Sequence, residues 1–302
     1  MNQQNSSIAD RYDVIVVGAR AAGAATAMLL ARRGVSVLAI DRAPYGSDTL
    51  STHSLAGPGV LQLSRWGLLD TIREAGTPVT KTVVFNYGPE HVRIDVPTRG
   101  DVDGLYAPRR TLLDATLVDA AVDAGADVRH GVTMVQVTQD DDGRVDGVEI
   151  DVDGRRQTVG ARVVVGADGM RSRVARQVGA ATIHEEPVGA TSIFGYFEGL
   201  ADDTIVNHYG DDRVVGVIPT NDGLACVWVG MPLDRFDRVA RGRVAEAHAA
   251  EVATVPELHA QLAGREPVGG FKSFPGTPGF LRQAWGPGWA LVGDAGYFKD
   301  PV

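Results

Sequence analysis

The glycines of the segment VGARAAGAATA, and the acid that follows it, have the spacing of a pyrophosphate-binding turn. Gly18 permits a tight turn, and Gly23 lets a helix pack closely behind it, so that a pyrophosphate can sit on the unpaired amides of the helix N-terminus. Asp41 follows at about the spacing where a carboxylate accepts hydrogen bonds from a ribose, which disfavours NADP at this site. Arg20 replaces the middle glycine of the usual pattern, and its guanidinium could face a phosphate, flank a ring or lie in solvent.

The segments around these residues predict a strand, a helix and a second strand. The runs YDVIVVGA and VSVLAID are rich in Val and Ile, which is typical of strands buried on both faces of a sheet. The segment AATAMLLARRG between them has good helix formers and ends at Gly34. Together they predict one complete βαβ unit of an α/β protein.

After this unit the sequence predicts two helices and three strands, and beyond Val178 the residue composition changes. The residues beyond Val178 are rich in aromatic and β-branched types, which predicts an antiparallel sheet, then a polar helix over 233–252 and a Gly/Pro loop at GGFKSFPGTPGF. The earlier elements are helices over 57–76 and 109–126 and strands over 128–139, 145–151 and 157–169.

Composition and net charge indicate what kind of molecule the protein binds. The net charge of −9 and the pI near 5.2 argue against nucleic acid and favour a small molecule. Cys226 is the single cysteine, so no intrachain disulfide forms, and it is expected to be a buried apolar residue. The N-terminus lacks the pattern of a signal peptide, and the apolar run 21–31 is too short for a membrane span, so a cytoplasmic protein is expected. The scarcity of Lys beside Arg suggests a GC-rich bacterial genome.

Two later motifs complete a recognisable set. In VVVGADGMRSRVARQVG a buried strand leads to Asp168 and Gly169, with Ser172 placed to cap the next helix. In LVGDAGYFKDPV a strand leads to Gly293, Asp294 and Pro301. In this order the motifs resemble the FAD-dependent oxidoreductases of the p-hydroxybenzoate hydroxylase type, which include monooxygenases and are related to flavin-dependent halogenases and geranylgeranyl reductases. The resemblance covers about residues 12–302.

The resemblance implies that FAD is the cofactor and assigns its contacts. The Asp168 segment would lie near the FAD pyrophosphate and the nicotinamide path, although Ala175 stands where the family has Arg. Asp294 would bind the ribityl hydroxyls, with Pro301 beside the flavin ring. Arg110, or alternatively Arg109, would lie near the flavin. The residues predicted to bind the cofactor are Gly18, Arg20, Ala22, Gly23, Asp41, Arg42, Thr49, Arg109, Arg110, Asp168, Gly169, Gly293, Asp294 and Pro301.

The resemblance also implies a reaction. NAD(P)H, bound transiently or replaced by a separate reductase, would reduce FAD, O2 would form a C4a-hydroperoxide, and a small organic substrate would be hydroxylated or epoxidised. A geranylgeranyl reductase-like alkene reductase and a halogenase are the alternatives. Lys81 and the F-x-D-P match at 298–301 suggest the halogenase, whose Trp-x-Trp-x-Ile-Pro signature is missing. His53 and Lys81 are the catalytic candidates, and no metal cluster or Ser-His-Asp set is seen.

The expected fold is a Rossmann-like FAD-binding domain of the GR2 type, with a βαβ unit and a β-meander, plus an antiparallel-sheet domain for the substrate. The FAD-binding domain is predicted to comprise 1–80, 105–179 and 281–302, and the substrate domain 81–104 and 180–280, with the sheet over the reactive face of the flavin. The usual helix after Pro301 is absent, so we expect a chain truncated at its C-terminus. An inactive FAD-binding fragment is therefore the non-enzyme alternative, and a homodimer is left open.

Overall fold

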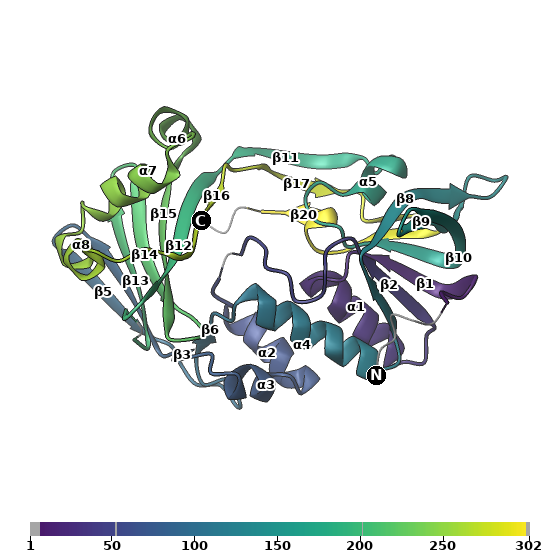
Figure 1. Cartoon of the computed structure of the whole chain (residues 1–302), viewed down its shortest axis with the longest axis horizontal. Helices are drawn as coiled ribbons and strands as arrows, with labels where there is room; N and C mark the ends of the chain where they lie inside the picture. The colour runs from purple at the N-terminus through teal and green to yellow at the C-terminus, as the bar shows by residue number, and fades with distance from the viewer. Residues whose placement is uncertain (1–6, 52, 201, 300–302) are drawn as a thin grey trace. The chain divides into compact units, whose positions relative to one another are not determined.

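The computed structural model describes residues 7–51, 53–200 and 202–299. These residues form two compact units, and each unit is assembled from stretches that are far apart in the sequence (Figure 1). Within the described residues, unit 1 comprises 7–47, 113–187 and 278–299, and unit 2 comprises 48–51, 53–112, 188–200 and 202–277.

Unit 1 is built on an eight-stranded sheet. Its strands are β1 (Arg11–Val17), β2 (Val37–Asp41), β7 (Asp127–His130), β8 (Val132–Gln139), β9 (Val145–Val152), β10 (Arg155–Gly166), β18 (Trp285–Gly286) and β19 (Trp289–Leu291). The order is β18-β19-β10-β1-β2-β7, and β7, β2, β1, β10 and β19 run parallel, as the Val-rich runs predict. β8, β9 and β10 form the antiparallel meander. The predicted βαβ unit and meander of the α/β fold are therefore confirmed.

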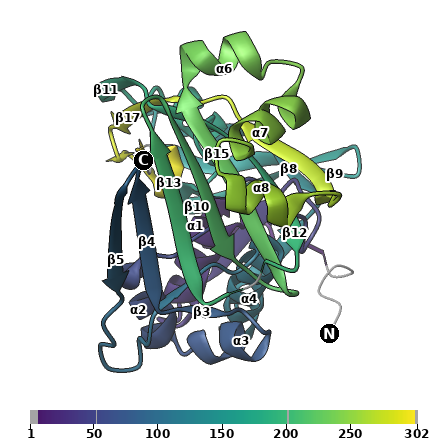
Figure 2. The same cartoon turned by 90° about the vertical axis from the view of Figure 1, so that its left-hand side faces the viewer.

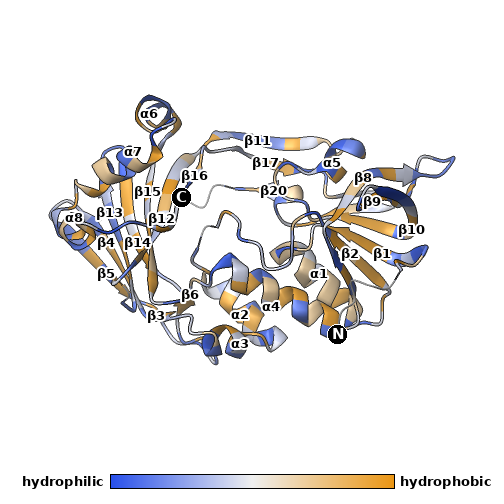
Figure 3. Ribbon diagram, viewed as in Figure 1, coloured by the Kyte–Doolittle hydropathy of each residue, from blue (hydrophilic) through white to orange (hydrophobic). Residues whose placement is uncertain are grey.

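The core of unit 1 is apolar on both sides of this sheet. Ile15 and Leu38 belong to the same buried cluster as the meander residues Val148 and Ile150, and Figure 3 shows hydrophobic stretches in β1, β2 and β10. A small sheet in the order β11-β17-β20 lies outside the main one. The remaining elements are α1 (Ala21–Ala31), α4 (Arg110–Asp123), α5 (Arg173–Gln177), the 3₁₀ turn η2 (Gly293–Ala295), β11 (Thr182–Val188), β17 (Pro278–Arg282) and β20 (Tyr297–Phe298).

Unit 2 is built on a seven-stranded sheet. Its strands, in spatial order, are β16 (Val268–Phe274), β12 (Ala190–Glu198), β15 (Leu224–Pro232), β14 (Arg213–Pro219), β13 (Thr204–Gly210), β4 (Thr82–Tyr87) and β5 (Glu90–Asp95). The pairs are antiparallel as predicted, except that β13 and β4 run parallel. The sheet is therefore mixed.

Three helices cover one face of this sheet, as Figure 2 shows: α6 (Leu233–Val239), α7 (Val244–Val252) and α8 (Pro256–Leu262). Their apolar side chains pack on Val215, Val227 and Val229. The other elements of unit 2 are α2 (Gly57–Trp66), α3 (Leu69–Glu74), β3 (Val79–Thr80) and β6 (Leu105–Tyr106). None of the helices within the described ranges is both long and apolar enough to cross a bilayer.

The structure differs from the sequence prediction in several segments. The single helix predicted over 233–252 is two helices, α6 and α7, which are separated at 240–243. The predicted loop GGFKSF is strand β16, because it pairs with β12 despite its glycines. The predicted helix over 57–76 is divided at Gly67, whose left-handed φ of 75° ends α2. Residues 48–80 and 105–112, predicted within the FAD-binding domain, group with unit 2, where β3 pairs with β6.

Candidate functional site

The three predicted motifs meet at one edge of the parallel sheet in unit 1. Gly18 follows β1, and a Cβ added to it would lie 2.4 Å from the carbonyl oxygen of Ala167, which follows β10. Gly293 follows β19, and a Cβ there would lie 2.7 Å from Cβ of Ala22 in α1. Since the carboxyl ends of parallel strands share an edge, residues that are 149 and 271 positions apart in sequence become neighbours (Figure 1).

The turn between β1 and α1 has the close packing that a pyrophosphate site needs. Gly18 has a φ of 100°, which glycine adopts most readily. A Cβ on Gly23 would lie 1.7 Å from the carbonyl oxygen of Gly18, so only glycine fits there. The first turn of α1 is thereby held against the turn, with its amides at the sheet edge. These residues fit the phosphates of FAD, and their role as ligands stays a prediction.

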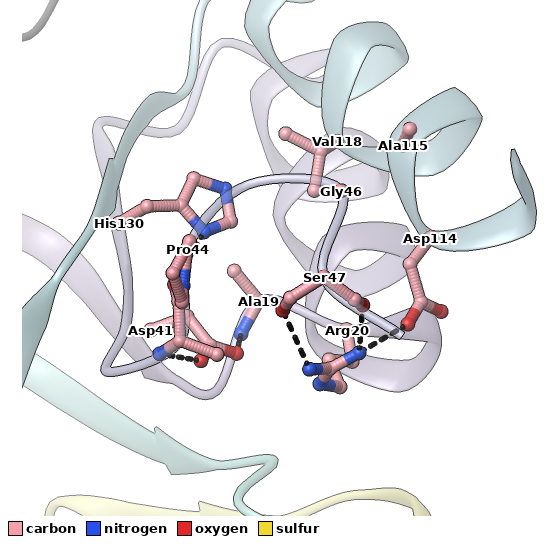
Figure 4. A pocket seen from close by; sticks show the side chains of 11 residues that line it. Ala19, Arg20, Asp41, Pro44, Gly46, Ser47, Asp114, Ala115, Val118 and His130 are labelled. Atoms are coloured by element: carbon pink, nitrogen blue, oxygen red, sulfur yellow. Dashed lines mark hydrogen bonds and ion pairs between the residues drawn. The ribbon is translucent and has the colours of Figure 1, made fainter. Parts of the chain in front are cut away.

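Asp41 ends β2 and braces the neighbouring loops. One carboxylate oxygen accepts a hydrogen bond from the amide of Ala19 at 2.9 Å, and the other accepts one from the amide of Ala43 at 2.8 Å. The carboxylate lies on the wall of a small pocket at the carboxyl end of β2 (Figure 4). The pocket is lined by Ala19, Arg20, Asp41, Ala43, Pro44, Gly46, Ser47, Asp114, Ala115, Val118 and His130.

His130 forms one wall of this pocket and was not found from the sequence. Its Nδ1 lies 3.2 Å from the carbonyl oxygen of Ala43, and its ring meets Tyr45 edge to face at 5.6 Å. Its Nε2 is buried and has no hydrogen-bond partner among the described residues. A buried polar atom without a partner is unfavourable, so this nitrogen is a candidate for a ligand contact, which stays a prediction. No sequence signal marks His130, because only the strand order brings β7 beside β2.

Arg20 makes contacts within the protein, and whether it also faces a phosphate or flanks a ring stays a prediction. Its Nη1 donates to the carboxylate of Asp114 and to the carbonyl oxygen of Ser47, both at 3.0 Å, and its Nη2 donates to the hydroxyl of Ser47 at 3.0 Å (Figure 4). Asp114 is only 5% exposed. The guanidinium therefore ties the glycine turn to α4 and to the loop after β2.

The carboxylate of Asp168 accepts hydrogen bonds from residues at the start of α5. It accepts hydrogen bonds from the hydroxyl of Ser172 at 2.5 Å and from the amide of Arg173 at 2.6 Å. Ser172 accepts from the amide of Ala175 at 2.9 Å, so the predicted helix cap is confirmed. The arrangement makes the Asp168 and Gly169 turn rigid, while a contact with FAD remains a prediction.

Arg282 links the second and third motifs, although no motif pointed to it. Its guanidinium donates to the carbonyl oxygens of Met170, at 3.1 Å, and Ala295, at 2.9 Å. Asp294 is exposed in η2 between them. Pro301 lies outside the described residues.

His53 and Arg109 lie in a polar cluster of unit 2. Nε2 of His53 shares a hydrogen bond of 2.9 Å with the hydroxyl of Tyr196, and His53 is 8% exposed. The guanidinium of Arg109 lies over the ring of Tyr196, 3.7 Å from its centroid, and donates to Asp48 at 3.2 Å. Asp48 also pairs with Lys272 on β16. We call Asp48, His53, Arg109, Tyr196 and Lys272 the unit 2 cluster.

The ionisation of this cluster follows from burial and charge. Burial and the charge of Arg109 lower the pKa of His53 to about 4, so the ring is neutral at physiological pH. Burial alone would raise the pKa of Asp48, but its bonds to Lys272 and its other partners lower it. Burial raises the pKa of Tyr196, which keeps its hydroxyl protonated.

The sheet face that carries the cluster is aromatic. Strand register places Lys272, Phe194, Trp228, Gly216, Asn207 and Phe85 in one row across the sheet. We call these residues the sheet row, and paired residues on neighbouring strands point to the same face. Gly216 is required in the row, because a Cβ there would lie 2.1 Å from Nε1 of Trp228. Nε1 of Trp228 is itself buried without a partner among the described residues.

The other residues predicted from the sequence bond to neighbouring loop residues or lie exposed on the surface. Thr49 donates its amide to Asp48 at 2.9 Å, and Nη1 of Arg110 donates to the carbonyl oxygen of Leu50 at 3.2 Å. Arg42 is exposed on the loop after β2, and Lys81 is exposed between β3 and β4. Across the described ranges, no group of His, Cys, Asp and Glu side chains could hold a metal ion.

Comparisons with known proteins agree with this geometry. The chain is 32% identical to the menaquinone reductase of Mycolicibacterium smegmatis, over 97% of this chain and 72% of that protein. In structure it is similar to the myxobacterial chondrochloren halogenase CndH, with a TM-score of 0.84, 24% identity and coverage of 97% and 70%. It is also similar to PqsL, a probable FAD-dependent monooxygenase from Pseudomonas aeruginosa, with a TM-score of 0.79, 20% identity and coverage of 96% and 80%.

The family model described as the FAD binding domain matches residues 11–295, which include nearly all the motifs from which the resemblance was inferred. The matched range contains the glycine turn, Asp41, Asp168 and Asp294. The chain therefore belongs to the FAD binding domain family, and it is an FAD-dependent oxidoreductase.

Proposed function

We propose that this chain is an FAD-dependent reductase that acts on an apolar ring substrate of quinone type. Unit 1 would bind FAD through the glycine turn, Asp41 and the pocket beside it. FAD, once reduced by NAD(P)H, would supply a hydride, and one further proton converts a quinone to a hydroquinone. The substrate would lie on the sheet row of unit 2.

We infer the substrate class from the residues of the sheet row. Trp228 and Phe85 are partly exposed and offer aromatic faces, which favour stacking with a flat apolar ring, while Phe194 is buried beside them in the row. Lys272 stands at one end of the row and would face an oxygen of that ring. The likeness to a menaquinone reductase over 97% of the chain supports reduction of a quinone-type molecule.

The test uses the protein loaded with FAD and reduced by NADH or NADPH in the absence of oxygen. Menadione, a small naphthoquinone, is then added, and the return of the flavin absorbance is followed. Anaerobic return supports the reductase. A protein that does not take up FAD, or whose flavin is not reoxidised by menadione, contradicts it.

A matched pair of variants separates specific from nonspecific oxidation, because quinones oxidise many exposed flavins. Trp228→Leu should slow the menadione step about threefold to tenfold, since it removes an aromatic contact worth about 1 kcal/mol. Trp285→Leu changes a tryptophan that is 72% exposed in unit 1 and should leave the rate unchanged. Equal rates in both variants would contradict binding at the sheet row.

A monooxygenase is the second candidate, favoured by the cation pair of the unit 2 cluster. Arg109 and Lys272 would stabilise a phenolate, and a phenolate ring is electron-rich enough to accept oxygen. In that case NAD(P)H consumption requires O2 and the product gains an oxygen atom. Dependence on chloride would instead support a halogenase, and oxygen-independent saturation of an alkene would support a geranylgeranyl reductase-like activity.

A further inference from the structure

We propose that Lys272 and Arg109, held together by Asp48, bind a negatively charged oxygen on the ring of the substrate. The substrate class rests on the proposed function. The ligand group is a phenolate, or the oxygen of a quinone that becomes negative when the ring accepts a hydride. This assigns Arg109 to the substrate, whereas the resemblance gave it as the alternative to Arg110 beside the flavin.

The charges of the cluster do not cancel. Arg109 and Lys272 both pair with the single carboxylate of Asp48, and no other carboxylate in the described part of the chain forms an ion pair with either cation. The three side chains are 17% to 28% exposed, so water screens them only partly. His53 is neutral and adds no charge. The cluster therefore carries a net positive charge in a partly buried place, which favours an anion.

Arg109 is already held in position to bind. Its amide donates to Oδ1 of Asn221 at 3.0 Å, and its guanidinium rests on the ring of Tyr196. Its Nε is buried and has no acceptor among the described residues. A guanidinium held in this way is suited to donate a hydrogen bond to a ligand oxygen, because little side-chain freedom is lost on binding.

Lys272 is placed by the strand register. It lies opposite Phe194 at the β16 end of the sheet row. His53 packs edge to face on Phe194, with ring centroids 4.6 Å apart, and bonds to Tyr196. The neutral histidine thus supports both the aromatic row and the platform beneath Arg109. The substrate ring would lie beside this buried part of the row, with one ring oxygen facing Lys272.

The test uses 4-nitrophenol as the probe, because its anion absorbs visible light and its neutral form does not. The probe is titrated with pH in the presence of FAD-loaded protein, against the same protein without probe. The wild type should lower the apparent pKa of bound nitrophenol by about one unit, which is a tenfold preference for the anion. Lys272→Met should abolish this preference.

Two further variants decide the interpretation. Lys272→Arg keeps the charge and should keep the preference, which excludes loss of folding as the cause. Arg99→Met removes the same charge from an exposed place in unit 2 and should behave as the wild type. The proposal is overturned if Lys272→Met binds the anion as tightly as the wild type, or if the wild type does not prefer the anion. Because no turnover is measured, a negative menadione test would not affect this result.

Discussion

Arg20 and Asp114 form an ion pair in unit 1, with Nη1 of the guanidinium 3.0 Å from Oδ2 of the carboxylate. The side chain of Asp114 is 7% exposed and that of Arg20 is 28% exposed. Arg20 stands in the glycine turn and Asp114 in α4, so the pair joins two segments that are 94 residues apart. The arginine in the glycine motif is therefore a structural link between these two segments.

Arg20→Met should lower the free energy of unfolding by about 2 to 3 kcal/mol, because it leaves the buried carboxylate of Asp114 without this cation. Urea denaturation measures the change. The double variant Arg20→Met/Asp114→Asn should lose less than the sum of the two single variants. As a control, Arg238→Met breaks an exposed pair with Asp234 and should change stability by about 0.5 kcal/mol or less. Equal losses for Arg20→Met and the control would show that the buried pair contributes nothing.

Gly23→Ala should be poorly tolerated, since its Cβ would lie 1.7 Å from the carbonyl oxygen of Gly18. The helix must shift from the turn, which we expect to cost about 1 to 3 kcal/mol of stability and to weaken FAD binding. Thermal unfolding and flavin fluorescence titration measure the two effects. Gly57→Ala is the control, because its Cβ would meet nothing within 4 Å. A Gly23→Ala protein that binds FAD like the wild type would contradict the close-packing argument.

Local patterns were enough to predict the FAD-binding half of the fold. The βαβ unit, its glycine turn and Asp41 lie within 31 consecutive residues, so strand, turn and helix signals reinforce one another. The meander and α4 were found in the same way. These patterns predict helices, strands and turns, whose residues lie close together in the sequence.

The contacts that complete the candidate site depend on pairing over long distances. Lys272 stands in a Gly-rich segment that looks like a loop, and it becomes a strand residue because β16 pairs with β12 some 80 residues earlier. His53 stands in a polar loop and is buried against Phe194 and Tyr196, which lie more than 140 residues away in the sequence. The local sequence does not indicate which distant residues become such partners.

Asp41→Ala should weaken the affinity for FAD by about tenfold or more. It removes the proposed ribose acceptor, and it also frees the amides of Ala19 and Ala43 that now bond to the carboxylate. Quenching of flavin fluorescence measures the dissociation constant. Asp123→Ala, at an exposed place near the end of α4, is the matched control. Unchanged affinity in Asp41→Ala would remove Asp41 from the cofactor site.

Stability should depend on pH through two buried histidines. Burial and then Arg109 lower the pKa of His53 from 6.5 to about 4, with Lys272 adding to the effect and Asp48 opposing it. Burial likewise lowers the pKa of His248, which bonds to the carbonyl oxygen of Val227, to about 4. Above pH 6.5 both histidines are neutral in the folded and unfolded chain, and their contribution is fully present. As the pH falls from 6.5 toward 4, only the unfolded chain takes up the protons, so stability is lost.

Each histidine should account for about 3 kcal/mol of this loss, because the pKa difference is about 2.5 units. His53→Asn keeps a residue that tolerates the φ of 66° at this position and should remove about half of the pH dependence between 6.5 and 4. Urea denaturation at a series of pH values measures the slope. His184→Asn, on the exposed strand β11, should leave the slope as in the wild type. An unchanged slope in His53→Asn would mean that His53 becomes protonated in the folded protein near its ordinary pKa, which would make the unit 2 cluster more positive and less buried than the structure shows.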